Sequence, residues 1–259
     1  MNYSTAVILG LVQALGEFLP ISSSGHLVLV PWLLGWPYQG KSFDVALHWG
    51  TLIAVCGYFW SDWIALIRAG LSGRESPERR LFWGIVLATI PGGLAGLLLE
   101  NQVERLFHSP QTISAALAAF GVLLWIADRF GSRSRAAADL DWRPCLLIGL
   151  AQALAIVPGV SRSGITMTAG LFLGLKREEA ARFSFLLSAP IIVAAGVLKL
   201  RHLGGEAFSG PLWLGMLVTV GAGLAAIRFL LAYLRERGVG AFVAYRLLLA
   251  AFCLFWALR

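Results

Sequence analysis

Two short stretches place ionisable residues among apolar neighbours. The first, GLVQALGEFLPISSSGH at residues 10–26, contains Glu17 and His26. The second, PGVSRSGIT at residues 158–166, contains Arg162. A charge removed from water costs free energy unless a partner compensates it, so such residues in an apolar chain usually serve a function. These two stretches are therefore the candidate places for chemistry in this chain.

The types and spacing of these residues favour the binding of a phosphate group. Gln13 and Glu17 are four residues apart and would share one face of a helix, which Pro20 would end. The serines that follow would lead into a second helix, whose N-terminus favours an anion. PGVSRSGIT repeats this arrangement and adds a guanidinium suited to phosphate. The candidate phosphate-binding residues are Ser22, Ser24, Gly25, Ser161, Arg162, Ser163, Gly164 and Thr166.

Glu17 and His26 offer chemistry that an anion-binding loop alone does not have. Glu17 could hold a divalent cation that bridges phosphate oxygens, or it could act as a base. His26 could act as a nucleophile, an acid or a base. If the two loops meet, the sequence predicts a site that binds a phosphate group and acts on it.

The composition indicates that these stretches belong to a membrane protein. Of the 259 residues, 58% are hydrophobic and 14% are charged, and the mean hydropathy is +0.75. Soluble domains carry about 25% charged residues, so the chain is predicted to be an all-α polytopic protein in the lipid bilayer. The first basic residue is Lys41, so we expect no removable signal peptide. The cysteines, Cys56, Cys145 and Cys253, are expected to pack as small hydrophobic residues.

Six apolar runs are long enough to be membrane spans, and two more are interrupted. The predicted spans are at about 45–60, 81–99, 112–128, 183–200, 211–231 and 240–258. Residues 5–36 and 145–175 are each broken near the middle by proline and a Ser/Gly cluster. Each arm would cross only part of a hydrocarbon core of about 30 Å. Each interrupted segment is therefore predicted to be a re-entrant hairpin enclosed by protein or water.

The two interrupted segments match each other at an offset of 139 residues. Ten of the 26 positions in residues 10–35 are identical to those in residues 149–174, and the polar ones are included. The chain is therefore predicted to be two repeats, residues 1–139 and 140–259, each a re-entrant hairpin followed by three spans. Because three is an odd number, the repeats would be inverted with respect to each other.

The basic residues sort between the two faces of this predicted topology. One face carries Arg68, Arg74, Arg79, Arg80, Arg129, Arg133, Arg135, Arg143, Lys176, Arg177, Arg182, Arg228, Arg235 and Arg237. The other carries Lys41, Arg105, Lys199, Arg201 and Arg259. The positive-inside rule makes the first face cytoplasmic and puts both termini outside. The net charge of +7 is then explained by basic loops that orient the protein and face anionic lipid at the inner surface of the membrane, so no nucleic-acid partner is expected. Of the remaining two arginines, Arg246 is expected to be structural.

These motifs resemble a known family over essentially the whole chain. QALGEFLPISSSGH and PGVSRSGIT, with SFDVALHWGTLIAV and REEAARFSFLLSAPI, are similar to the bacitracin-resistance type of undecaprenyl pyrophosphate phosphatase. The resemblance implies hydrolysis of undecaprenyl pyrophosphate to undecaprenyl phosphate and inorganic phosphate in the bacterial plasma membrane. This reaction recycles the lipid carrier for peptidoglycan synthesis and confers bacitracin resistance. The site would lie near the midplane and serve the outer leaflet.

The resemblance also implies roles for individual residues. It places a metal-linked pair at Gln13 and Glu17, catalytic groups at Ser23 and His26, and phosphate-binding groups at Ser161, Arg162 and Thr166. Because Gln13 stands where the family also admits Glu, the substrate's oxygens would have to complete the shell of a bound Mg²⁺ or Ca²⁺. Asp44 and His48 stand where Glu and Gln are expected, and either they form a second layer of polar groups or Asp44 simply begins the first span.

Several alternatives stay open at this point. The nucleophile is His26, Ser23, or a water activated by Glu17 and His26. Another class of lipid phosphatase also uses Ser-Gly-His, but it needs a histidine six residues after its arginine, where Thr168 stands. A transporter built from inverted repeats is the main alternative to an enzyme, and a structural scaffold ranks last. A homodimer is compatible with such short helices, and His108 and His202 are expected to be loop residues without chemistry.

Overall fold

The computed structural model describes residues 2–199 and 209–257, and helices make up nearly all of it. The elements are α1 (Tyr3–Phe18), α2 (Ser23–Leu34), α3 (Lys41–Tyr58), α4 (Trp60–Leu71), α5 (Pro77–Phe107), α6 (Pro110–Phe130), η1 (Ala137–Asp139), α7 (Trp142–Ala153), η2 (Leu154–Ile156), α8 (Arg162–Phe172), α9 (Arg177–Lys199), α10 (Gly210–Glu236) and α11 (Gly240–Ala257). No β-strand occurs in the two described ranges. The predicted all-α class is confirmed. His202 and the last residues of the spans predicted at 183–200 and 240–258 lie outside the described residues.

Both predicted helix breaks are present, and they are built alike. The first separates α1 from α2 at residues 19–22, and the second separates η2 from α8 at residues 157–161. Ser22 and Ser161 are the N-caps of α2 and α8, with φ of 78° and 73°. Each hydroxyl accepts a hydrogen bond from the backbone N–H three residues later. A left-handed backbone is uncommon for serine, so the same strained turn precedes the N-terminus of each second arm.

Five helices are long and apolar enough to cross a membrane: α5 over Pro77–Leu99, α6, α9 over Arg177–Val197, α10 and α11. They correspond to five of the six predicted spans. The sixth predicted span, at about 45–60, falls on α3, which ends at Tyr58, and α4 continues from Trp60 at an angle of 78° to it. Phe59 lies at the bend, with its ring packed against those of Tyr58 and Phe185. The two helices together amount to at most one span.

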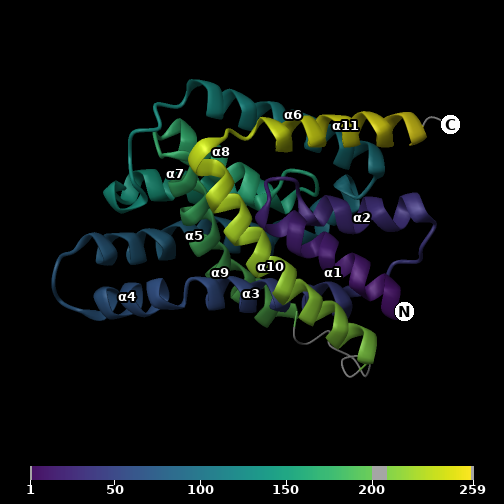
Figure 1. Cartoon of the computed structure of the whole chain (residues 1–259), viewed down its shortest axis with the longest axis horizontal. Helices are drawn as coiled ribbons and strands as arrows, with labels where there is room; N and C mark the ends of the chain where they lie inside the picture. Colours follow the sequence, from purple (N-terminus) through teal and green to yellow (C-terminus); the bar gives the residue numbers. More distant parts are fainter. Residues whose placement is uncertain (1, 200–208, 258–259) are drawn as a thin grey trace.

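Helices from distant parts of the chain enclose the two interrupted segments. Helix α1 packs along α10, α7 packs along α5, and α6 lies beside α11 (Figure 1). The contacts are close: a Cβ atom at Gly10 would lie 2.6 Å from the Gly215 carbonyl oxygen, and one at Gly149 would lie 2.5 Å from the Ala88 carbonyl oxygen. Gly10 and Gly149 occupy equivalent positions in the matched segments. Both need glycine because another helix backbone lies against them.

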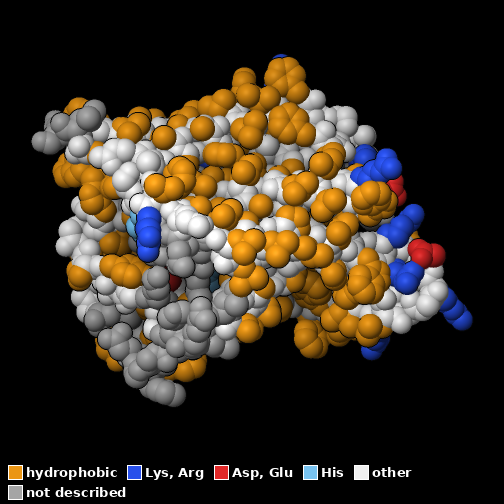
Figure 2. All heavy atoms as spheres, turned by 180° about the vertical axis from the view of Figure 1, so that it is seen from behind, with side chains coloured by type: hydrophobic (Ala, Val, Ile, Leu, Met, Phe, Trp, Pro, Cys, Tyr) orange, Lys and Arg blue, Asp and Glu red, His pale blue; other side chains and the backbone are white. Residues whose placement is uncertain are grey.

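The outer surface suits a lipid environment. Figure 2 shows hydrophobic side chains over most of one face, with most Lys and Arg side chains gathered toward one end. Helix α1 begins and α11 ends at the opposite end of the molecule from the turn between α4 and α5 (Figure 1). Large apolar residues such as Leu98 and Leu248 are about 70% exposed, and soluble monomers rarely expose apolar patches of such extent.

Candidate functional site

Glu17 joins the two interrupted segments at one buried point. It lies in the last turn of α1, and its Oε1 accepts a hydrogen bond of 2.9 Å from the Arg162 guanidinium of α8. Its Oε2 accepts a 2.5 Å hydrogen bond from Ser23 Oγ and a 3.3 Å hydrogen bond from Gln13 Nε2. The carboxylate therefore contacts three residues that the sequence predicted for the site, and one of them comes from the distant segment.

Arg162 is held in place by helix α9 as well as by Glu17. Its guanidinium donates a 2.8 Å hydrogen bond to the Ser184 carbonyl oxygen. Thr166 Oγ1 lies 2.8 Å from the Arg162 carbonyl oxygen and 2.8 Å from Ser184 Oγ. Ser184 is fully buried and was not predicted as a site residue. The only sequence signal for it is a hydroxyl within an apolar run.

The two breaks also contact each other directly. Ser163 Oγ donates a 3.1 Å hydrogen bond to the Leu19 carbonyl oxygen, which links the second segment to the first break. A Cβ atom at Gly25 would lie 3.4 Å from the Gly159 Cα atom, so the start of α2 approaches the second break closely. Both helix N-termini thus lie in one region, where their N–H groups and dipoles favour an anion.

His26 has both ring nitrogens engaged. Nδ1 lies 2.7 Å from the Ser22 carbonyl oxygen, and because a carbonyl only accepts, the contact assigns the proton to Nδ1. Nε2 lies 2.7 Å from the hydroxyl of Tyr245 on α11, which donates to it in this tautomer. The two rings are also stacked, with an interplanar angle of 10°. Tyr245 was not predicted, and nothing in the sequence pattern brings it to His26.

The oxygen donors around Glu17 decide whether a divalent cation fits the site. Gln13 Oε1 is buried and has no hydrogen-bond partner among the described residues, so it is free to be a ligand beside the Glu17 carboxylate. The described part of the chain has no group of three His, Cys, Asp or Glu residues that could hold a metal. Two protein oxygens suit a hard cation only when other oxygens complete its shell. The residues therefore fit Mg²⁺ or Ca²⁺ together with phosphate oxygens.

His48 lies close to Glu17, and Asp44 lies one helical turn before His48 on α3. His48 Nε2 lies 4.0 Å from Glu17 Oε2, and His48 Nδ1 lies 2.7 Å from the Asp44 carbonyl oxygen. The Asp44 carboxylate accepts a 2.8 Å hydrogen bond from the Tyr38 hydroxyl. His48 therefore lies beside Glu17, whereas Asp44 lies in the first turn of α3, so both interpretations of these residues stay open.

The family match covers nearly the whole chain. The family model described as bacitracin resistance protein BacA matches residues 6–252. The chain belongs to the BacA family. Its relatives include proteins named undecaprenyl-diphosphatase from Moorella thermoacetica, 51% identical over 100% of both chains, and from Pelotomaculum thermopropionicum, 51% identical over 95% of this chain and 94% of that one. A protein of the same name from Elusimicrobium minutum is 47% identical over 100% of this chain and 99% of its own.

In this BacA-family protein, most of the predicted site residues form one connected cluster. Gln13, Glu17, Ser23, Arg162 and Thr166 are joined through hydrogen bonds. Their neighbours at the starts of α2 and α8 are Ser22, Gly25, His26, Ser161, Ser163 and Gly164. Ser24 is the exception, because its side chain is exposed and lies 3.4 Å from Ser22 Oγ. His108 is exposed between α5 and α6, as predicted.

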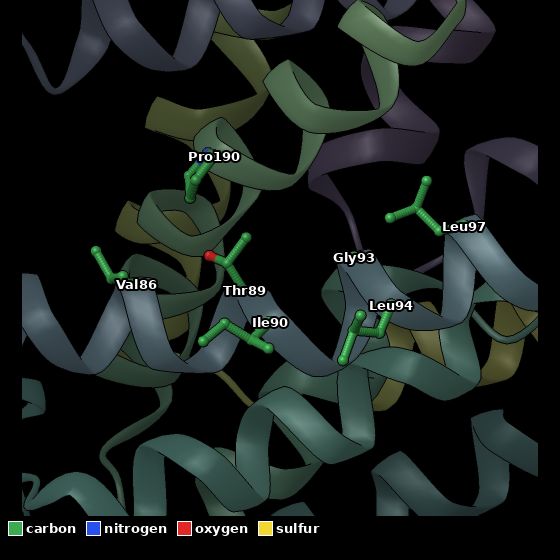
Figure 3. A pocket seen from close by; sticks show the side chains of 7 residues that line it. All are labelled: Val86, Thr89, Ile90, Gly93, Leu94, Leu97 and Pro190. Carbon is green, nitrogen blue, oxygen red and sulfur yellow. The ribbon is translucent and has the colours of Figure 1, made fainter.

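A separate groove between α5 and α9 is apolar. Figure 3 shows Val86, Ile90, Leu94 and Leu97 of α5 along it, with Pro190 of α9 opposite. Among the described residues that line it, Thr89 is the one with a polar side chain and none is ionisable. The described lining therefore has no cationic group for a phosphate.

Proposed function

We propose that this BacA-family chain hydrolyses undecaprenyl pyrophosphate to undecaprenyl phosphate and inorganic phosphate. The Glu17–Arg162 ion pair carries the proposal, because it joins a carboxylate and a guanidinium from distant segments at the N-termini of two helices. Relatives named undecaprenyl-diphosphatase support it, since they match along nearly their full length. Bacitracin resistance fits the printed name of the family.

Arg162 and the N-termini of α2 and α8 would bind the pyrophosphate. A guanidinium has five N–H groups, more than its contacts with Glu17 and Ser184 need, so it can donate to phosphate while it keeps them. The N–H groups of the first turns of both helices add donors from either side. In this arrangement the terminal phosphorus would lie near Ser23.

Ser23 is the proposed nucleophile. Its hydroxyl already donates to Glu17, and a nucleophile within hydrogen-bond reach of a base is the usual pairing for covalent catalysis. Ser23 Oγ would attack the terminal phosphorus as Glu17 takes its proton, and the bond to the bridging oxygen would break to release undecaprenyl phosphate. Water would then attack the phosphoserine, and as the bond from phosphorus to Ser23 Oγ breaks, Glu17 would return its proton to Ser23 while inorganic phosphate leaves with the protons of the water. The contact of His26 Nε2 with Tyr245 makes direct attack by His26 the weaker alternative.

Gln13 and Glu17 would hold the divalent cation. When bound, Mg²⁺ or Ca²⁺ would neutralise the negative charge that builds up on the phosphate oxygens. The residues themselves position the substrate, since phosphoryl transfer depends mainly on orientation and electrostatics.

The interrupted segments are proposed to be re-entrant hairpins in two inverted repeats. Helices α1, α2, α7 and α8 have 16, 12, 12 and 11 residues, so at about 1.5 Å per residue none crosses a core of about 30 Å. Both termini would lie outside the plasma membrane, the basic end would face the cytoplasm, and the site would serve the outer leaflet. A homodimer is compatible with this arrangement.

Phosphate release by purified protein in detergent tests the proposal. The parent is compared with Glu17→Gln and Arg162→Ala, in Mg²⁺, Ca²⁺ or EDTA. Arg235→Ala serves as a control, because Arg235 is exposed and its ion pair is with Glu178, outside the site. Metal-dependent release is expected from the parent and the control but not from the two site variants. Folded parent protein that releases no phosphate under any metal condition contradicts the proposal, and transport of prenyl phosphates in liposomes would then be measured.

A further inference from the structure

Arg246 is the largest fully buried side chain among the described residues. It lies in α11 and is 0% exposed. Its guanidinium donates four hydrogen bonds, all to backbone carbonyl oxygens: those of Leu117 (3.0 Å), Pro20 (3.2 Å), Gly159 (2.9 Å) and Val160 (3.1 Å). One arginine therefore binds three segments that are far apart in the sequence.

Three of these four partners lie in the two breaks at the candidate site, and the fourth, Leu117, lies in α6. Pro20 lies in the first break, two residues before the N-cap Ser22. Gly159 and Val160 lie in the second break, directly before the N-cap Ser161. A Cβ atom at Gly164 would lie 3.0 Å from one nitrogen of the guanidinium, so the guanidinium also lies against the first turn of α8. The position of Arg246 thus sets how the two helix N-termini lie relative to each other.

The charge of Arg246 has no carboxylate partner in the described parts of the chain, where its hydrogen bonds go to carbonyl groups. A buried cation without a counter-ion is costly. The Arg246 guanidinium lies next to the N-termini of α2 and α8, so its positive charge adds to the attraction of these N-termini for an anion. Arg246 therefore combines contacts that join three segments with a positive charge close to the candidate site.

We propose that Arg246 is a positioning residue for pyrophosphate hydrolysis. Its hydrogen bonds to carbonyl groups in both breaks keep Ser23 of one segment and Arg162 of the other in place around the same phosphate group. The neighbouring Tyr245 contacts His26 from the same helix, so α11 supports both sides of the site. This inference rests on the proposed function, but the geometry of the two breaks can be measured without it.

The test uses Arg246→Lys and Arg246→Met in the full chain. Lysine keeps the charge but has one compact donor group, which cannot reach carbonyls on three segments. We expect kcat to fall about tenfold or more in Arg246→Lys and further in Arg246→Met, with KM changing less than about threefold, because misplaced groups lose transition-state contacts. Hydrogen exchange should speed up in both breaks at once, at residues 19–25 and 158–164.

Arg177→Met is the matched control. Arg177 also forms a partly buried network, with Asp128, but Asp128 lies 11 residues beyond Leu117 on α6, about 16 Å further along the helix. We expect it to lower the melting temperature while kcat stays within about threefold of the parent, since the site is untouched. The inference is overturned if Arg246→Lys keeps full kcat, if only KM changes, or if Arg177→Met at an equal melting temperature loses as much kcat. An inactive parent would instead refute the proposed function, and exchange in the two breaks would still decide the role of Arg246.

Discussion

Ser23 Oγ lies 2.5 Å from Glu17 Oε2 and donates a hydrogen bond to it across the break between α1 and α2. The break therefore does more than end a helix. It folds the chain back so that a hydroxyl and a carboxylate six residues apart meet at the start of the next helix. The first prediction follows from this contact.

Ser23→Ala should abolish hydrolysis if Ser23 is the nucleophile. Removing a nucleophilic serine costs at least about a thousandfold in kcat, because no other group forms the covalent bond. Acid quenching of the parent during turnover with labelled substrate should trap a phosphoserine at position 23. Ser114→Ala is the control, because Ser114 is also a buried serine and its hydroxyl hydrogen-bonds to the Pro110 carbonyl oxygen of α6 and to Cys253 of α11. Residual hydrolysis above about one tenth of the parent would show that water or His26 attacks instead.

Tyr245→Phe separates the two possible roles of His26. If the Tyr245 hydroxyl positions His26, its removal should lower kcat by up to about a hundredfold, the lower end of what a general acid or base contributes. If His26 is itself the nucleophile, removing the hydroxyl frees Nε2, and the rate should rise. Tyr58→Phe, at an exposed tyrosine on α3, should leave kcat unchanged. Measuring whether kcat falls or rises in Tyr245→Phe therefore distinguishes the two roles of His26.

Gln13 should set the metal requirement. Gln13→Glu adds a second carboxylate beside Glu17, so this variant should reach half-maximal activity at a lower concentration of Mg²⁺ or Ca²⁺ than the parent. Gln13→Leu removes a ligand, so it should need a higher concentration. Gln152 is the control, because it occupies the equivalent position in the second matched segment and its Oε1 is likewise buried without a partner among the described residues. Gln152→Leu should leave the metal dependence unchanged. If the parent and the three variants all showed the same metal dependence, Gln13 would not be a metal ligand.

The sequence predicted the two breaks because their cause is local. Pro20 and Pro158 lack an N–H, and the serines after them supply caps, so both ends of each break can be read from neighbouring residues. The bend at Phe59 could not be predicted in this way. The apolar run continues through it, and hydropathy averages carry no information about backbone angle.

The contacts of Tyr245, Arg246 and Ser184 could not be read from the sequence either. Arg246 reaches a carbonyl 226 residues away, and Tyr245 reaches an imidazole 219 residues away. Both depend on which helices pack together, and apolar helices in lipid do not reveal this in their hydrophobic pattern. The matched segments predicted that two polar loops would meet, but they did not predict that α11 would donate hydrogen bonds to both loops.

The ion pair between Glu17 and Arg162 should show coupled effects on stability. Arg162→Met leaves the Glu17 carboxylate buried without its partner, which destabilises by about 3–5 kcal/mol. Adding Glu17→Gln removes the stranded charge, so the double variant should regain part of the free energy of unfolding while remaining inactive. Thermal unfolding in detergent measures this. The exposed pair Arg235 and Glu178 is the control, and its variants should change stability little. A double variant no more stable than Arg162→Met would contradict the coupling.

The two ends of α6 should lie on opposite sides of the membrane. Helix α6 has 21 residues, which at about 1.5 Å per residue gives about 31 Å, the thickness of the hydrocarbon core. Gln111→Cys and Ser132→Cys place a thiol at either exposed end, in a background where the three native cysteines are replaced.

An impermeant maleimide added to intact cells should label position 111 and reach position 132 only after permeabilisation, because basic residues follow α6 and such loops stay in the cytoplasm. Both variants must retain hydrolysis, so that labelling reports the native fold. The reverse labelling pattern would invert the topology and place the basic end outside. Equal labelling of both positions in intact cells would mean that α6 does not span the membrane.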